Sequence, residues 1–119
     1  AILVSIHCNA AGNGSDWMSA RGWEAWTSVG KTKADKLATC LYEGAEHCLP
    51  GMNMRKDMAD GDPDKESQFY ILRHTNCPAV LTENLFQDNR EDVEFLLSER
   101  GKRAIVSLHV WGIMKYLGL

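Results

Sequence analysis

The sequence lacks the features that mark several large classes of protein. Its 119 residues contain no apolar run near the roughly 20 residues that a membrane-spanning helix needs. Basic residues are not in excess, since 13 Lys and Arg stand against 16 Asp and Glu, for a formal net charge of -3. That balance argues against a protein that binds nucleic acid through a basic surface. No repeat or low-complexity tract is present either, which leaves one globular domain or a portion of one.

The cysteines also lack a pattern that carries chemistry. The four of them form no Cys-x-x-Cys pair, which zinc-binding cysteine motifs usually contain. Cys40 and Cys48 lie on one predicted helix, about 12 Å apart along its axis, which is too far for a disulfide. We expect most of the cysteines to be small buried apolar side chains, although the sequence leaves their redox state open.

The N-terminus lacks the lead-in of a complete chain. The first residue is Ala and not an initiator Met, and no basic leader is present. The run from Ile2 to Ile6 is too short for the apolar core of a signal peptide. This run is rich in β-branched residues, which predicts a strand buried on both faces. Because the sequence opens inside such a strand, we expect residues 1–119 to be the C-terminal portion of a single larger domain.

The remaining pattern predicts strands that alternate with helices. Strands are expected at 2–6, 23–29, 69–72 and 78–86, helices at 31–49, 89–99 and 102–117, and loops at 10–22 and 51–67. Asn89 is a suitable N-cap for the second helix, with Asp92 three residues later, and Gly118 is a suitable stop for the last. This order indicates the α/β class, with a sheet flanked by helices.

Two of the predicted strands end on residues that can do chemistry. His7 follows the first strand, and Glu83 follows the apolar part of the strand at 78–86. Ligands of open α/β sheets bind outside the carboxyl ends of strands, so the two side chains are candidates for one crevice. A histidine can hold a metal and a glutamate can act as a general base. The alternatives are a histidine that is only hydrogen-bonded in place and a glutamate paired with a nearby Arg or Lys.

Several segments, in order, resemble one family of enzymes. "SIHCNA" is similar to the SIHANA-type motif of the zinc-dependent N-acetylmuramoyl-L-alanine amidases, often called amidase-3, which include bacterial autolysins and phage endolysins. "GWEAW", "KADKLATCL" and "MRKD" match segments that follow in the family, and "PAVLTENLFQDN" resembles its PAVLVE-x-GF-x-SN stretch. The closing "RAIVSLHVWGIMKYL" is similar to the family's last helix, so the resemblance covers nearly the whole chain.

The resemblance implies a twisted mixed sheet flanked by helices and a peptidoglycan substrate. It implies that Zn²⁺, held by two His and one Glu, activates water to cleave the amide between the lactyl group of muramic acid and L-alanine. His7 matches the second metal-binding histidine and Glu83 the catalytic glutamate. Zinc lowers the pKa of bound water, and a carboxylate beside it can move the proton. The family context further implies a cell-envelope or secreted protein, bacterial or phage.

The departures from the family pattern concern the metal first. The family's first histidine lies in a DPGHGG-type motif and is followed by a glutamate ligand, and neither motif occurs here. A catalytic zinc needs three protein ligands, and the resemblance supplies only His7, so this chain alone is expected to bind zinc weakly and to be inactive. His47, His74 and His109 are expected to be surface or packing residues.

Residues beside the two motifs are further candidates for the site. Asn9 and Arg55 are candidate substrate-binding residues, with the alternatives of a loop-stabilising asparagine and a solvated arginine. Cys8, beside His7, is expected to pack in the core, and Leu85, which replaces a family glycine, is expected to narrow the groove.

The tryptophans are expected to divide between the core and the groove. Trp17 lies in a loop where it can stack on sugar or peptide. Trp23 and Trp26 have opposite strand parity, which predicts one in the core and one on a groove wall. Trp111 is expected in the core.

Two other functions remain open from the sequence. One is a non-catalytic cell-wall binding module that keeps the fold without the metal. The other is a thiol hydrolase that uses Cys8 with His7, although adjacent residues on a strand point to opposite faces. The oligomeric state is not indicated.

Overall fold

The computed structural model describes residues 1–28, 32–59, 61, 63–67 and 69–119. Their strands are β1 (Leu3–Asn9), β2 (Trp23–Thr27), β3 (Lys65–Glu66) and β4 (Ala79–Phe86), and their helices are α1 (Lys33–Cys48), α2 (Tyr70–Arg73), α3 (Arg90–Leu97) and α4 (Glu99–Leu117). The sheet has the order β1-β4-β2-β3, with β1 parallel and β2 antiparallel to β4. The expected mixed sheet flanked by helices is therefore confirmed. No helix in these ranges is long and apolar enough to cross a membrane.

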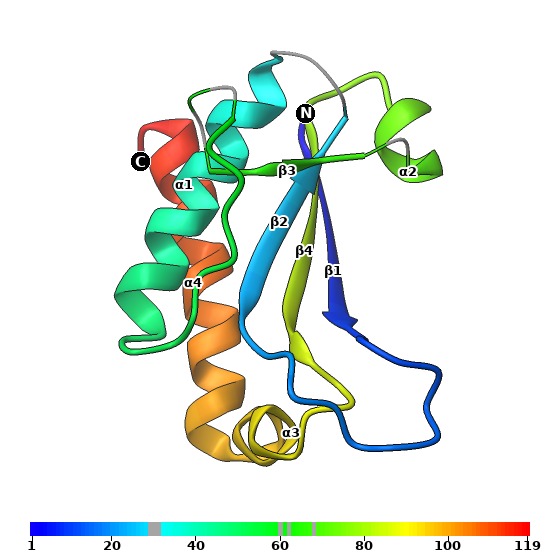
Figure 1. Ribbon diagram of the computed structural model, residues 1–119. Coiled ribbons are helices and arrows are strands. Elements are labelled where there is room, and N and C mark those ends of the chain that lie inside the picture. Colours follow the sequence, from blue (N-terminus) through cyan, green and yellow to red (C-terminus); the bar gives the residue numbers. More distant parts are fainter. Residues whose placement is uncertain (29–31, 60, 62, 68) are drawn as a thin grey trace.

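The alternation of β4 divides the sheet into two different faces. Val80 belongs to the main core, and the Thr82 hydroxyl lies 2.9 Å from the His109 imidazole of α4. Leu81 and Glu83 point to the opposite face, because successive side chains of a strand alternate. Figure 1 shows α1 and α4 together on the first side of the sheet, while only the short α2 stands by the second. We call this second side the open face.

The two long helices pack at unusually close range through glycine. A Cβ added to Gly44 of α1 would lie 2.6 Å from the carbonyl oxygen of Leu108 in α4. A Cβ on Gly112 would lie 2.9 Å from the Cα of Leu41. Backbone atoms cannot move aside as a flexible side chain can, so the helix-helix distance depends on these positions being glycine.

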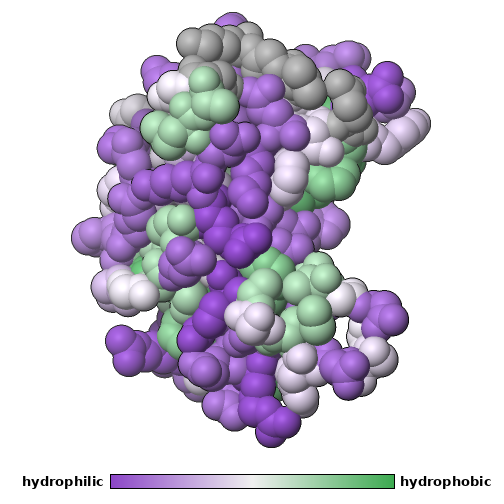
Figure 2. All heavy atoms as spheres, in the orientation of Figure 1, coloured by the Kyte–Doolittle hydropathy of each residue, from purple (hydrophilic) through white to green (hydrophobic). Residues whose placement is uncertain are grey.

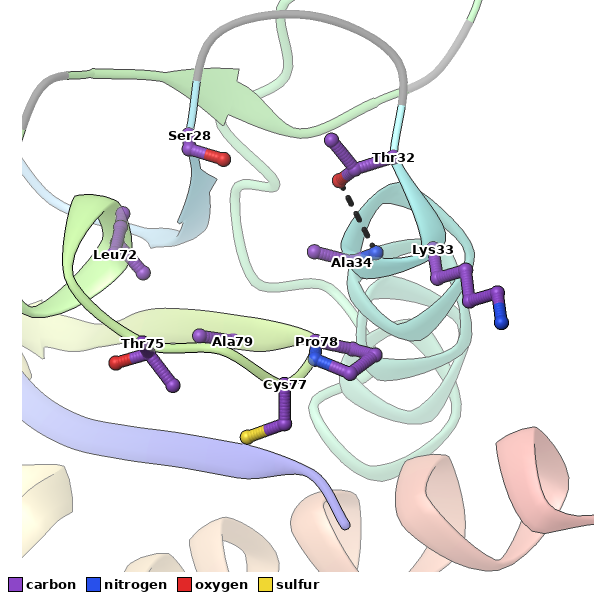
Figure 3. Close-up of a pocket in the computed structure, with 9 residues that line it drawn as sticks. All are labelled: Ser28, Thr32, Lys33, Ala34, Leu72, Thr75, Cys77, Pro78 and Ala79. Atoms are coloured by element: carbon purple, nitrogen blue, oxygen red, sulfur yellow. Dashed lines mark hydrogen bonds between the residues drawn. The ribbon is translucent and has the colours of Figure 1, made fainter.

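The long helices are capped by side chains or by glycine, and the caps at Asn89 and Gly118 are the predicted ones. The Thr32 hydroxyl accepts from the Ala34 amide at 3.2 Å (Figure 3), and the Asp35 carboxylate accepts from the Thr32 amide, which completes a capping box for α1. Asn89 caps α3 as expected, and Gly118 ends α4 with φ of 76°. α4 begins earlier than predicted, at Glu99, because the Ser98 hydroxyl caps it.

Three expectations about the elements are wrong. The segment 69–72 is predicted as a strand but belongs to the helical turn α2, in which only Leu72 is buried. So short an apolar run carries no periodicity that separates helix from strand. β1 is not buried on both faces, because it is the edge strand and Ile6 is 57% exposed. The predicted loop 51–67 includes the two-residue strand β3, while Val29 and Lys31 lie outside the described residues.

The end of β4 has an irregular backbone at Leu85. The register shifts between β1 and β4, since His7 pairs with Glu83 but Asn9 pairs with Phe86. Leu85 takes up the extra residue with φ of 67°, a left-handed conformation that β-carbon sterics disfavour. Its side chain is fully buried in the main core, so the expectation that it narrows the groove is wrong. The family's glycine at this position is matched here by a strained residue that contributes to the core.

Replacing Gly44 tests the close helix contact. Gly44→Ala should destabilise the fold by about 1–3 kcal/mol, because overpacking outweighs the gain in helix propensity. Urea denaturation of this variant and of the exposed α1 variant Lys36→Ala measures the difference. Gly44→Ala unfolding at the wild-type midpoint would contradict the proposed contact.

Replacing Leu85 tests the backbone strain. Leu85→Ala should cost about 2–4 kcal/mol for the lost core contacts. Leu85→Gly should be at least as stable as Leu85→Ala, since glycine relieves the left-handed strain, whereas glycine in an ordinary strand is the less stable of the two. Urea denaturation of both variants measures the difference. A clearly lower midpoint for Leu85→Gly than for Leu85→Ala would contradict the strain.

Candidate active site

The sheet register brings three ionisable side chains into one row across the open face. His7 of β1 pairs with Glu83 of β4, and Glu83 pairs with Glu24 of β2. Paired residues of neighbouring strands point to the same face and lie close together. The two residues predicted from the strand ends are therefore brought together, and a second carboxylate joins them.

The environment of the Glu83 carboxyl raises its pKa. Its Oε2 atom is buried and has no hydrogen-bond partner among the described residues. Burial, with a further contribution from the negative charge of Glu24, raises the pKa of Glu83 from its ordinary value of 4.5 to about 7. Both protonation states are thus populated near neutral pH, which suits a group that takes up and returns a proton. The alternative that Glu83 only pairs with a base does not hold for the described contacts.

Glu24 is tied down by its neighbours, unlike Glu83. The Arg55 guanidinium Nε lies 2.8 Å from one carboxylate oxygen of Glu24, and the Trp26 indole donates to the other at 2.6 Å. The Lys65 ammonium lies 3.6 Å from that second oxygen. Glu24 is only 2% exposed, so its charge requires these partners. It therefore stays in place beside Glu83 as a fixed negative charge.

The position of Arg55 follows from backbone pairing. The Arg55 amide donates to the Trp23 carbonyl at 2.8 Å, and the Trp23 amide donates to the Asn53 carbonyl at 2.9 Å. This anchors the segment beside β2, where the guanidinium also lies 5.1 Å from the centre of the Phe86 ring. The alternative of a solvated loop charge is wrong. Figure 2 shows the molecule hollowed on its right side, between the part that holds α2 and the loop that follows β1.

Asn9 shapes the loop that leaves β1. Its side-chain oxygen accepts from the Ala10 amide at 2.9 Å, and its carbonyl accepts from the Gln87 amide at 2.7 Å. These bonds give Asn9 a structural task, and a contact with substrate stays a prediction.

Cys8 contradicts its expectation, because it is exposed rather than in the core. β1 is the edge strand of the sheet, and the burial of its residues falls towards its end. Desolvation and the charge of Glu83 raise the pKa of the Cys8 thiol, which reduces the thiolate needed by a thiol hydrolase. Of the other cysteines only Cys40 is buried, and all four are free thiols.

The other aromatic and histidine residues divide largely as expected. Trp23 is fully buried in the core, while Trp26 faces the open side. His109 packs against Thr82, and the exposed His47 stacks on Trp111, which is only half-buried. None of these histidines lies in the row with Glu83.

The described residues contain no complete metal site around His7. His7 is exposed, so its ring is accessible from solvent, and its Nε2 atom lies 2.7 Å from the Ser5 hydroxyl. Among the described residues no three His, Cys, Asp or Glu side chains gather closely enough to hold a metal ion. The requirement of a catalytic zinc for three protein ligands is therefore not met within these ranges.

Glu24 and Lys65 were missed by the sequence interpretation. A signal was present, because "WEAW" places a glutamate in the middle of an aromatic strand, where a charge is costly unless partnered. Lys65, in contrast, lies in a predicted loop, and only the short pairing of β3 with β2 places it beside Glu24.

A cavity lies at the end of the sheet that is opposite the row of His7, Glu83 and Glu24. It has a volume of about 260 Å³ and lies between the first turn of α1 and the segment that leads into β4 (Figure 3). Leu72, Cys77 and Pro78 are among its lining residues, and none of the predicted site residues lines it.

The raised pKa of Glu83 predicts a pH-dependent stability. A carboxyl whose folded pKa exceeds its unfolded value favours folding below about pH 4.5, and this contribution is lost as pH rises through about 7. The advantage of Glu83→Gln over wild type should therefore grow by about 1–3 kcal/mol between these limits, allowing for partial solvent access. Urea denaturation across pH in the presence of EDTA measures it. Glu94→Gln, an exposed carboxylate on α3, is the control, and parallel pH curves for wild type and Glu83→Gln would contradict the shift.

Comparison with known proteins gives a consistent relationship. A family model described as N-acetylmuramoyl-L-alanine amidase matches residues 1–115. An endolysin of Bacillus phage SPP1 is 30% identical over 118 residues, which are 99% of this chain and 41% of that protein. An N-acetylmuramoyl-L-alanine amidase of Bacillus licheniformis is 40% identical over 55 residues, which are 46% of this chain and 22% of that protein.

Solved structures agree with this relationship. The N-acetylmuramoyl-L-alanine amidase from Clostridium difficile 630 superposes with a TM-score of 0.82 and 28% identity, covering 98% of this chain and 57% of that chain. The catalytic domain of the CD27L endolysin gives a TM-score of 0.65 and 25% identity, covering 96% and 54%. This chain thus spans about half the length of the relatives it matches. Its sequence and its fold together place it in the N-acetylmuramoyl-L-alanine amidase family.

Proposed function

We propose that this chain is the C-terminal portion of a zinc-dependent amidase domain that acts on peptidoglycan at the cell envelope. The bond cleaved is the amide between the lactyl group of N-acetylmuramic acid and the L-alanine of the stem peptide. The observation that carries this proposal is Glu83, which lies in register with His7 on the open face and has an unpartnered carboxylate oxygen and a pKa of about 7. Family membership supports the substrate class.

Glu83 acts in this proposal as general base and then as general acid. Its carboxylate takes a proton from the water that attacks the amide carbonyl, and its carboxylic acid returns that proton to the leaving amine of L-alanine. A pKa near 7 makes both transfers energetically accessible at neutral pH. Glu24 contributes by keeping a fixed negative charge beside Glu83 while Arg55 and Trp26 hold it in place.

His7 is one ligand of the zinc ion in this proposal. Bound zinc would supply Lewis-acid polarisation of the carbonyl and a more acidic water. Two further ligands must come from outside the described residues, and we infer that another portion of the same domain supplies them. The chain by itself is then inactive.

Arg55 and Asn9 are the proposed substrate-binding residues. Arg55 is about one-third exposed and uses its Nε for Glu24, which leaves the outer edge of the guanidinium for a carboxylate of the stem peptide. Asn9 lies at the end of β1, two residues after His7, and its side-chain NH₂ group would contact the same substrate.

A non-catalytic cell-wall binding module is the second candidate. The observation that favours it is the lack of a three-ligand metal cluster in the described ranges. It predicts binding to cell walls without release of peptide, so one experiment separates the two functions.

The full-length protein should lose activity when Glu83 is changed. Glu83→Gln keeps the shape of the side chain but cannot transfer the proton, and turnover should fall by about 10²–10⁴-fold. The measurement is the release of peptides with N-terminal L-alanine from purified cell walls, with Glu94→Gln as the control. Release at the parent's rate by Glu83→Gln would exclude Glu83 as the catalytic group, and no release by the parent would favour the binding module.

A further inference from the structure

A large cavity lies at the carboxyl ends of β1 and β4, beyond the row of ionisable residues. It has a volume of about 690 Å³, opens to solvent, and is lined by the loop from Ala10 to Trp17 and by the turn at Gln87 and Asp88. The loop begins three residues after His7, so the cavity starts about 10 Å from the row along the strand direction. Figure 1 shows this loop reaching away from the ends of both strands. Neither His7 nor Glu83 lines the cavity.

The cavity is preformed, because hydrogen bonds anchor its loop at both ends. The Asp88 carboxylate accepts from the backbone amides of Ala11 and Gly12 at 2.9 and 2.8 Å. At the other end, the Met18 amide donates to the Asp88 carbonyl at 2.6 Å, and the Asn89 side chain donates to the Met18 carbonyl at 3.0 Å. A ligand would therefore meet an ordered wall and would lose little affinity to loop ordering.

The lining combines an exposed aromatic ring with short polar side chains. Trp17 is 53% exposed, and the Arg90 guanidinium lies 5.1 Å from the centre of its ring. Asn13, Ser15 and Asp16 supply amide, hydroxyl and carboxylate groups in the same cavity. A sugar ring has an apolar face for an aromatic partner and a rim of hydroxyls for such polar groups, so the combination suits a carbohydrate.

Charge separates this cavity from the other side of the row. Asp16 and Asp88 line it, whereas the cations Arg55 and Lys65 gather around Glu24 on the β2 side. The edge of the Arg55 guanidinium that Glu24 does not use offers a partner for a peptide carboxylate on the β2 side, whereas the described residues that line the cavity include no cation. Uncharged sugar rings need no such partner.

We propose that the cavity beside Trp17 binds the sugar rings of the glycan strand, with the stem peptide on the β2 side towards Arg55. This assignment rests on the proposed amidase function, since it divides that substrate at the bond beside Glu83. Trp17 provides the stacking surface and Asp16 and Asn13 the hydroxyl partners. The loop between β1 and β2 is then the part of this chain that selects the glycan.

The test measures binding of each half of the substrate separately. The full-length Glu83→Gln protein, which cannot turn over substrate, is titrated with a GlcNAc–MurNAc disaccharide whose lactyl group is capped as a methylamide. It is also titrated with an N-acetylated stem peptide that begins with L-alanine. Trp17→Ala in this background should weaken disaccharide binding about tenfold and leave peptide binding unchanged. Trp17→Phe should retain most of the affinity, and Val110→Ala, an exposed apolar residue on α4, should change neither.

The outcomes distinguish this inference from the proposed function. Disaccharide binding that is absent, or unchanged in Trp17→Ala, overturns the glycan site, and so does a loss confined to the peptide. Circular dichroism of Trp17→Ala, together with the behaviour of Trp17→Phe, separates a lost contact from a misfolded loop. Failure of the parent to release peptides with N-terminal L-alanine overturns the amidase proposal alone, because disaccharide binding is measured without turnover.

Discussion

The pairing of β4 with a strand on each side is the constraint on which the rest of this structure depends. A strand has only two faces, and β4 uses one for the core and the other for chemistry. Val80 and Thr82 face the helices, while Leu81 and Glu83 face the open side. A shift of one residue in its register with β1 or β2 would exchange the two faces. The same register that buries the core therefore sets Glu83 between His7 and Glu24.

The helices fix this arrangement from behind. Gly44 and Gly112 let the backbones of α1 and α4 approach each other closely, and Thr82 and His109 join the sheet to α4 by a buried polar contact. A rigid rear layer allows the open face to hold an energetically unfavourable feature. That feature is a half-buried carboxyl with an unpartnered oxygen next to a second carboxylate, which is a common cost of a functional site.

The open face is organised by charge along two directions. Across the strands, Arg55 and Lys65 compensate the cost of burying the Glu24 carboxylate, whose charge contributes to the raised pKa of Glu83. Along the strands, the loop after β1 leads to an acidic and aromatic cavity held by Asp88. A substrate with a neutral sugar half and a charged peptide half would be oriented by this difference. The relatives are about twice as long as this chain, and our proposal assigns the remaining metal ligands to that additional length.

The sequence by itself determined the α/β order and two of the helix caps, and it singled out His7 and Glu83 as candidate site residues. Asn89 and Gly118 were predictable because capping is a local interaction, and His7 and Glu83 because their motifs are contiguous in sequence. Tertiary structure decided the rest. The turn at 69–72, the exposure of Ile6 and Cys8 and the burial of Leu85 depend on which strand lies at the edge and where the register shifts. The charged partners of Glu24 are Arg55 and Lys65, and no local pattern reports contacts between segments so far apart in the chain.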